Sequence, residues 1–201
     1  MKELKGISHK KHGLFFGVGI MDYDGLVWVN GKNINSYVAW LNMLHRCYDE
    51  KYISKSPTYR NCSVCEEWLY FSRFKAWFDS NYIDGYHLDK DLFQKGIGYK
   101  VYSPQTCCFL PKEINNLLIS EKRIGSELPR GVYRVGKNTF KVRLLLGKKS
   151  FDKYGFTNVS DAIYCAKSKK FEYVRNISFK MYKKGEISLS IYNAIIYYFK
   201  V

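Results

Sequence analysis

The sequence predicts an α+β protein in which short strands and amphipathic helices come first, followed by a small three-stranded antiparallel sheet packed on a helix. Two patterns carry this prediction. Apolar residues recur every three or four positions over residues 35–50 and 65–82, as on one face of a helix, and they alternate within residues 131–156, as in half-buried strands. With 46% hydrophobic and 17% aromatic residues, the 201-residue chain has enough apolar surface for packed cores.

Residues 14–34 are expected to form a hairpin or small meander, because Asp24-Gly25 and Asn30-Gly31 are tight-turn dipeptides between apolar runs. An amphipathic helix follows, behind a possible cap at Asn35 or Ser36. A second helix over residues 65–82 carries a stripe of aromatic side chains. A stripe at helical spacing usually packs in a core, and we assign to the core Trp68, Phe71, Phe74, Trp77 and Phe78.

Between residues 86 and 123 the sequence predicts a strand, a loop, a second strand and a helix. The first strand is "YHLDKDLF", and Gly96 and Gly98 open the loop after it. The stretch "YSPQTCCFL" leads from a Ser-Pro turn into the second strand, and Pro111 can begin the helix at its first turn. The short polar segment 121–130 is the predicted linker between a first domain, residues 1–120, and a second, residues 131–201.

The second domain is expected to hold the strands "GVYRV", "TFKVRLLL" and "KKSFDKYGF", with a hairpin at "GKN". A helix capped by Asn158 or Ser160 follows them. The last segment, "GEISLSIYNAIIYYFKV", reads as a short helical tail, although its Ile and Tyr content leaves a strand possible.

Alternation in the middle strand separates an apolar face from a basic one. Three apolar residues suit packing on the helix: Phe140, Val142 and Leu144. The other face carries Lys141, Arg143 and Leu145. Further candidates for the same outward surface come from the neighbouring strands, where the register of the third strand stays open: Tyr133, Lys149 and Lys153.

The net charge of +15 favours a polyanionic partner, such as nucleic acid or an anionic membrane face. Residues 1–126 hold 17 Lys and Arg against 13 Asp and Glu, whereas residues 127–201 hold 16 against 5. The C-terminal part is therefore the predicted polyanion contact. No apolar run is long enough to cross a bilayer, so we expect a soluble, cytoplasmic protein with no membrane partner.

Six cysteines raise the question of a metal site. Cys62 and Cys65 form one Cys-x-x-Cys, and Cys107 and Cys108 are adjacent, so a four-thiolate zinc site can be written. Adjacent cysteines rarely serve one tetrahedral metal together. The pattern favours free, mostly buried thiols in a reducing compartment over structural zinc.

Five stretches, "WLNMLHRCYD", "PTYRNCSVCEEWLYFSRFKAWF", "LDKD", "YSPQTCCFLP" and "INN", resemble in this order the phage-type HNH homing endonucleases over about residues 36–118. The resemblance implies a ββα-metal finger that holds Mg²⁺ or another divalent cation for phosphodiester hydrolysis. It implies no small-molecule cofactor. Phage or mobile-element origin is part of the same expectation.

In that family an Asp at the end of the first strand binds the metal and the adjacent His is the general base. A loop Asn steadies the finger, and a residue on the helix completes the metal shell. The resemblance makes Asp89 the metal ligand and Asn115 the helical ligand, while Thr106 stands where the loop Asn is expected. Lys90 stands in the base position. A protonated lysine cannot accept a proton at neutral pH, so Lys90 is expected to act as a phosphate clamp or transition-state cation.

Two alternatives remain at this finger. His87 lies two residues before Asp89 on the same strand face and is a candidate base, but the favoured interpretation is a surface or packing histidine. Metal-bound water or the substrate phosphate can also accept the proton. Asp91 either joins Asp89 as a second metal ligand or belongs to a solvated alternation of charges.

The stretch "RGVYRVGKNTFKVRLLLGKKSFDKYGFTNVSDAIYCA" is similar to the ethylene-response-factor type of DNA-binding domain over about residues 128–175. The similarity implies that the sheet enters the major groove of double-stranded DNA while the helix packs behind it. Arg143 can then read guanine, and lysines contact phosphates. The family tends to present arginine where this chain has Tyr133, Val135 and Leu145.

Two functions follow from these patterns. The first is an HNH-type, metal-dependent DNA endonuclease of the homing or mobile-element kind. The second is a non-catalytic DNA-binding protein, regulatory or packaging-related, that keeps the finger as a scaffold. An RNA-binding or virion-associated role remains, because positive charge does not identify its polyanion.

Overall fold

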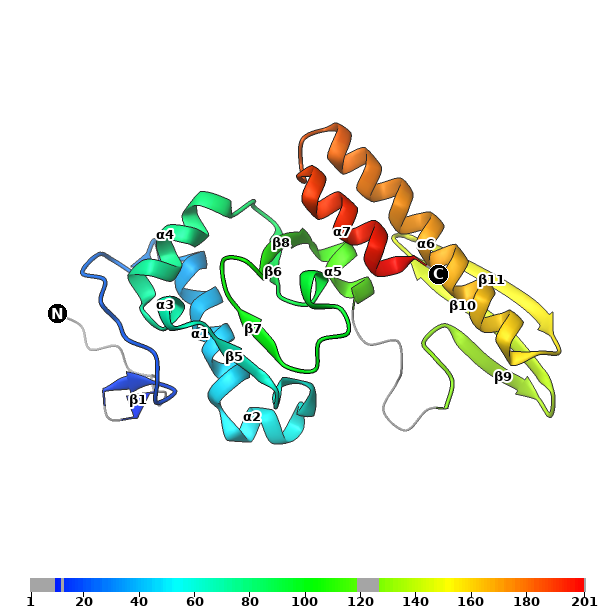
Figure 1. Ribbon diagram of the computed structural model, residues 1–201, viewed down its shortest axis with the longest axis horizontal. Helices are drawn as coiled ribbons and strands as arrows, with labels where there is room; N and C mark the ends of the chain where they lie inside the picture. Colours follow the sequence, from blue (N-terminus) through cyan, green and yellow to red (C-terminus); the bar gives the residue numbers. More distant parts are fainter. Residues whose placement is uncertain (1–9, 12, 119–126, 201) are drawn as a thin grey trace. The chain divides into compact units, whose positions relative to one another are not determined.

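The computed structural model describes residues 10–11, 13–118 and 127–200 (Figure 1). Helices and strands both contribute, and the predicted α+β class is confirmed. The chain divides into two compact units, Met1–Leu110 and Pro111–Val201, and each is described by itself. Much of the predicted linker over residues 121–130 lies outside the described residues.

The first unit contains four helices among its described residues: α1 (Asn35–Tyr48), α2 (Glu50–Lys55), α3 (Glu66–Leu69) and α4 (Phe71–Asn81). The single helix predicted over residues 65–82 is thus two, separated at Tyr70, whose backbone is extended. The N-terminal segment explains the break, because Ile20 bridges Tyr70 and its carbonyl accepts the Phe71 amide at 3.0 Å. An amide bonded to another segment cannot continue the helical pattern.

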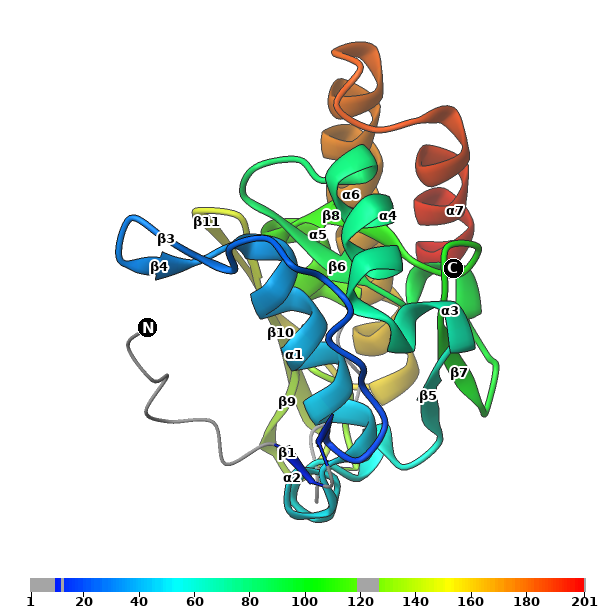
Figure 2. The same ribbon diagram turned by 90° about the vertical axis from the view of Figure 1, so that its left-hand side faces the viewer.

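Short strands frame these helices. The hairpin of β3 (Trp28–Val29) and β4 (Lys32–Asn33) turns at Asn30 and Gly31, whose φ angles of 50° and 78° fit the predicted tight turn. Figure 2 shows this hairpin extending away from α1. A second hairpin joins β1 (Lys10–Lys11) to β2 (Leu14–Phe15).

The finger region carries two further strand pairs. The predicted strands are β6 (Tyr86–Asp89) and β8 (Cys108–Pro111), which pair with each other. The sequence patterns missed β5 (Cys62–Val64) and β7 (Lys100–Tyr102), which form a parallel pair. Two 3-10 turns complete the region, η1 (Pro57–Tyr59) and η2 (Leu92–Gln94).

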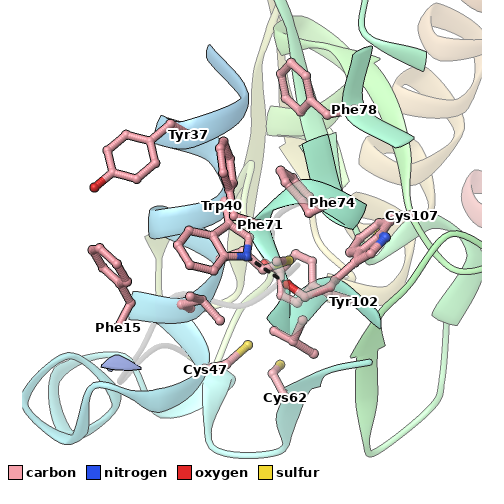
Figure 3. Close-up of a cluster of buried hydrophobic side chains, with 14 of the residues drawn as sticks. Phe15, Tyr37, Trp40, Cys47, Cys62, Phe71, Phe74, Phe78, Tyr102 and Cys107 are labelled. Carbon is pink, nitrogen blue, oxygen red and sulfur yellow. Dashed lines mark hydrogen bonds between the residues drawn. The ribbon is translucent and has the colours of Figure 1, made fainter. Parts of the chain in front are cut away.

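Aromatic side chains fill the core of the first unit (Figure 3). Trp40 of α1 is fully buried, and its indole Nε1 donates to the Trp68 carbonyl at 2.8 Å. The predicted stripe is confirmed as core, although Trp77 is only partly buried and stacks on Phe109 at a ring-centre distance of 5.4 Å. The buried members of the stripe are Trp68, Phe71, Phe74 and Phe78.

The second unit begins with α5 (Lys112–Leu118) and continues into a three-stranded antiparallel sheet. The strands β9 (Val132–Gly136), β10 (Thr139–Leu146) and β11 (Lys149–Phe156) lie in the order β11-β10-β9. The long helix α6 (Val159–Lys183) packs on one face, and α7 (Leu189–Phe199) runs beside it (Figure 1). The last segment is therefore a helix, not a strand.

Candidate nucleic-acid interface and metal site

The outward face of the sheet is defined by the pairing register of its strands. Directly opposed residues of an antiparallel pair project to the same side. Lys141 pairs with Tyr133 and Arg143 pairs with Asp152, whereas Val142 between them is fully buried on the side of α6. Lys141 and Arg143 therefore face away from α6, and the predicted alternation of the middle strand is confirmed.

Aromatic rings flank the first cation of this face, and a carboxylate holds the second. The Lys141 ammonium lies 5.9 Å from the ring centre of Tyr133 and 5.5 Å from that of Tyr154. The Arg143 Nε donates to Asp152 Oδ1 at 2.5 Å, and this hydrogen bond together with the carboxylate charge raises the pKa of Arg143. Because Asp152 engages Nε, other N–H donors of the guanidinium remain for further partners.

The face is mixed in character, although the sequence indicated a basic one. Asp152 offsets one of the two cations, and Leu145 exposes 71% of its surface and Tyr154 59%. Asp152 and Tyr154 were missed as members of this face because the register of the third strand was open. The pairing of β11 with β10 runs without a break from Leu146–Lys149 to Val142–Lys153, and the register shifts only beyond it, by one extra residue on β11 before Phe156.

Lys149 and Lys153 do not share this face, contrary to the expectation. Lys153 pairs with Val142 and Lys149 pairs with Leu146, so both lysines stem from the side of the sheet on which α6 packs. Both side chains are exposed, because β11 is an edge strand. The Lys153 ammonium lies 5.4 Å from the ring centre of Phe156.

Asp89 ends β6 and ties the following turn. Its Oδ1 accepts the backbone N–H groups of Asp91 at 3.0 Å and Leu92 at 2.8 Å. The side chain is buried, and burial raises the pKa of Asp89 to about 6 against the opposing effect of these hydrogen bonds. Among the described residues Oδ2 has no hydrogen-bond partner, and Asp89 as a whole is 5% exposed.

Lys90 points into the unit and pairs with Asp91. Its ammonium contacts both Asp91 oxygens, at 2.9 and 3.0 Å, and lies over the rings of Tyr59 and Tyr102 at 4.9 and 5.7 Å. Burial is the largest single effect and by itself lowers the pKa of Lys90, but the charge of Asp91, the hydrogen bond to it and the nearby Cys62 and Tyr59 together raise that pKa above its ordinary value. Burial likewise acts to raise the pKa of Asp91, yet the ammonium groups of Lys90 and Lys100 bring it below its usual value.

Two side chains fix the loop between the finger strands. Thr106 Oγ1 donates to the Val101 carbonyl at 2.5 Å and accepts the Ser103 amide at 3.1 Å, so it links two backbone positions of the loop. Gln94 was missed by the sequence patterns. Its buried amide bonds both backbone groups of Val101 and the Lys90 carbonyl, at 2.6 to 3.0 Å.

The remaining predicted site residues lie apart from these networks or in the other unit. His87 is exposed on β6. Asn115 lies half-buried on α5, in the second unit, so its position relative to Asp89 is not defined. Asp91 is committed to two lysines. The finger roles predicted for these residues therefore stay predictions.

The thiols are free, and burial raises their pKa where a shift is defined, for instance to about 12 for Cys47 and Cys107. Four of the six cysteines are buried. Within the described ranges, no three His, Cys, Asp or Glu side chains come together as a metal-binding group. None of the helices described is both long and apolar enough to cross a membrane.

Comparisons with protein-family models, with curated proteins and with solved structures find no match for this chain.

Proposed function

We propose that the protein binds double-stranded DNA with the face of the three-stranded sheet that is turned away from α6. The observation that carries this proposal is the register that gathers Lys141, Arg143, Tyr133 and Tyr154 on that face. Three strands spaced about 4.8 Å apart make a ribbon of roughly 10 Å, which fits a major groove about 12 Å wide.

The two cations have different parts in this proposal. Arg143 is oriented by Asp152 through Nε, so its terminal nitrogens can form a bidentate contact with a guanine edge. Lys141 stands between two tyrosine rings as a point charge suited to a phosphate. Exposed Leu145 can contact a thymine methyl group.

Fluorescence anisotropy with a labelled duplex tests the proposal. Arg143→Ala is expected to cost about 1–3 kcal/mol of binding free energy. Lys141→Ala is expected to reduce the slope of log affinity against log salt concentration by about 1. Lys184→Ala is the matched control, because this cation follows α6 and not the sheet. DNA affinity that does not depend on salt concentration, or that falls equally in all three variants, would reject this surface as the binding site. Tighter binding to an RNA duplex than to the DNA duplex would make RNA the ligand of this face.

A second candidate function, metal-dependent cleavage of DNA, is favoured by one observation at Asp89. Its Oδ2 is left for a ligand while Oδ1 holds the turn. Mg²⁺ usually keeps several waters and takes one or two carboxylates plus a substrate phosphate, so a single carboxylate oxygen fits this metal, and Asn115 is the further ligand the resemblance implies. The metal would supply an activated water and charge stabilisation.

The residues of this chain then divide the remaining work. Asp89 would hold the cation, and the hydrogen bonds of Thr106 and Gln94 fix the strand and the loop beside it. Lys90 has a raised pKa and cannot be the proton acceptor, which leaves His87 or solvent.

Nicking of supercoiled plasmid in Mg²⁺ or Mn²⁺ tests the second candidate. Asp89→Asn keeps an oxygen for the turn and removes the charge, so it is expected to abolish nicking without unfolding the protein. His87→Ala distinguishes a histidine base from solvent. DNA binding without nicking in either metal would reject the cleavage proposal and keep the binding proposal.

A further inference from the structure

An acidic side chain lies on the same sheet face as the two cations of the proposed DNA interface. Asp152 is the one acidic residue in the strands β9, β10 and β11. It pairs directly with Arg143, so both side chains project away from α6. A carboxylate near the phosphates of a duplex lowers the affinity for every DNA sequence with which it makes no contact. Its position therefore points to a part in choosing the duplex, not in binding duplexes generally.

The contact between the two side chains leaves part of each group for a ligand. Arg143 Nε donates to Asp152 Oδ1 at 2.5 Å, so the terminal nitrogens of the guanidinium are not used in this bond. Among the described residues, Oδ2 of Asp152 accepts no hydrogen bond. The two side chains are 54% and 25% exposed, and an ion pair this close to solvent contributes little to folding stability.

The Arg143 guanidinium has a second neighbour on β11. Tyr154 follows Asp152 by two residues and projects to the same side of the sheet, where it interacts with this guanidinium. An arginine that is already held in place loses less rotamer freedom when it binds. Arg143 is therefore suited to a base edge, which must be met at a fixed angle.

The two groups present donors and an acceptor in a defined order across the sheet. If the strands run along the major groove, neighbouring strands lie about 4.8 Å apart across it. Arg143 on β10 then offers two donors, and Asp152 on β11 offers an acceptor beside them. A G·C base pair presents the complementary order across the groove, because guanine N7 and O6 accept hydrogen bonds and the cytosine N4 amino group donates one.

Other base pairs match this order less well. An inverted C·G pair sets the cytosine amino group against the guanidinium and the guanine acceptors against the carboxylate. An A·T pair sets thymine O4, an acceptor, against the carboxylate. A T·A pair keeps an amino group for Asp152 but offers Arg143 a single acceptor. The inverted C·G pair is thus the strongest mismatch.

We propose that Arg143 and Asp152 together read one G·C base pair in a single orientation. Arg143 bonds guanine N7 and O6, and Asp152 Oδ2 accepts the N4 amino group of the paired cytosine. Asp152 is the specificity-determining member, because an acceptor-only group excludes guanine and thymine from the position it faces. This role rests on the proposed DNA binding by the outward face.

Selection from a random duplex library with the wild-type protein supplies the DNA for the test. Each G·C pair of a selected duplex is then inverted singly, and affinity is measured by fluorescence anisotropy. One inversion is expected to weaken wild-type binding about tenfold. Arg143→Ala should abolish the preference at that pair.

Asp152→Asn is the decisive variant, because it changes specificity and general affinity in opposite directions. The asparagine amide can donate to guanine, so the inversion should weaken binding by about threefold or less. Affinity for an unselected duplex should rise, because a negative charge has left the face. A purely structural role of Asp152 predicts no such opposition.

Asp161→Asn is the matched control, since it removes an exposed carboxylate from the first turn of α6 and should leave the inversion penalty unchanged. The role of Asp152 would be overturned if no single inversion weakened wild-type binding. The same holds if Asp152→Asn left the penalty unchanged, or if Asp161→Asn reduced it equally. In these cases salt-dependent binding that falls in Arg143→Ala keeps the binding proposal. A wild-type protein that bound no duplex would reject both.

Discussion

Replacing Asp91 by asparagine tests the partly buried Lys90–Asp91 ion pair of the first unit. Asp91 is the carboxylate partner of the Lys90 ammonium, and the Lys90 side chain is only 7% exposed. Asparagine has nearly the same shape but no charge. In the variant, Lys90 therefore stays among Tyr59 and Tyr102 with a positive charge that no carboxylate neutralises at hydrogen-bond distance.

The expected loss of stability follows from the burial of the two partners. Removing one member of a fully buried ion pair costs about 3–5 kcal/mol. Asp91 is one-third exposed and also contacts Lys100, so solvent screens part of the interaction. We expect Asp91→Asn to lower the free energy of unfolding by about 2–3 kcal/mol, a large share of a typical total of about 5–15 kcal/mol.

The pH dependence has a defined sign. The folded-state pKa of Asp91 is lowered, so its stabilisation is present above the ordinary pKa of 3.8 and is lost as the pH falls through the lowered value. The pKa of Lys90 is raised, so its contribution is present below 10.5 and is lost as the pH rises through the raised value. The difference in free energy of unfolding between wild type and Asp91→Asn should therefore be constant around neutral pH and shrink as the pH falls below 3.8.

Urea unfolding followed by tryptophan fluorescence measures this loss in the right unit, because all four tryptophans lie within residues 1–110. Asp79→Asn is the matched control: it breaks an exposed Lys75–Asp79 pair and is expected to cost at most about 0.5 kcal/mol. Lys90→Met combined with Asp91→Asn should recover part of the loss. A cost for Asp91→Asn no larger than that of the control would refute the reasoning.

Two further predictions concern named contacts. The raised pKa of Asp89 means that the wild-type protein loses stability as this carboxyl ionises between pH 3.8 and about 6, whereas Asp89→Asn does not. The variant should therefore become more stable relative to wild type over this range. The same difference in free energy of unfolding by urea at pH 4.5 and pH 7 would contradict this. Trp40→Phe leaves the Trp68 carbonyl without its donor and should cost about 1–3 kcal/mol by thermal unfolding, whereas Trp28→Phe on the exposed hairpin should be nearly neutral.

The parts of the fold that the sequence predicts are those set by local periodicity. Phe71, Phe74 and Phe78 recur at helical spacing and are buried, and Phe140 and Val142 alternate and are buried. In both cases the hydrophobic effect acts on a pattern visible within a dozen residues. The tight turn at Asn30 and Gly31 is equally local, because these residue types tolerate positive φ.

The parts that it does not predict depend on partners far along the chain. The helix breaks at Tyr70 because Ile20, fifty residues away, takes the Phe71 amide. Asp152 joins the outward face because β11 pairs with β10 in the register that sets Asp152 opposite Arg143, and Tyr154 follows two residues later on the same side. The inward position of Lys90 depends on Tyr59 and Tyr102 lying beside it, and no spacing within "HLDKD" signals that arrangement.

The ion pair at Lys90 also constrains any chemistry in the finger. For Lys90 to bind a phosphate, its ammonium must leave Asp91 and the two tyrosine rings. This movement would break the ion pair and the ring contacts that now hold the buried side chain. Lys100 already bonds the same carboxylate and exposes more of its side chain, so Asp91 keeps a cation if Lys90 moves. Without that movement, Lys100 is the cation of this network that a phosphate can reach. The proposed binding by the sheet requires none of these rearrangements, so the two proposed functions can be tested independently of each other.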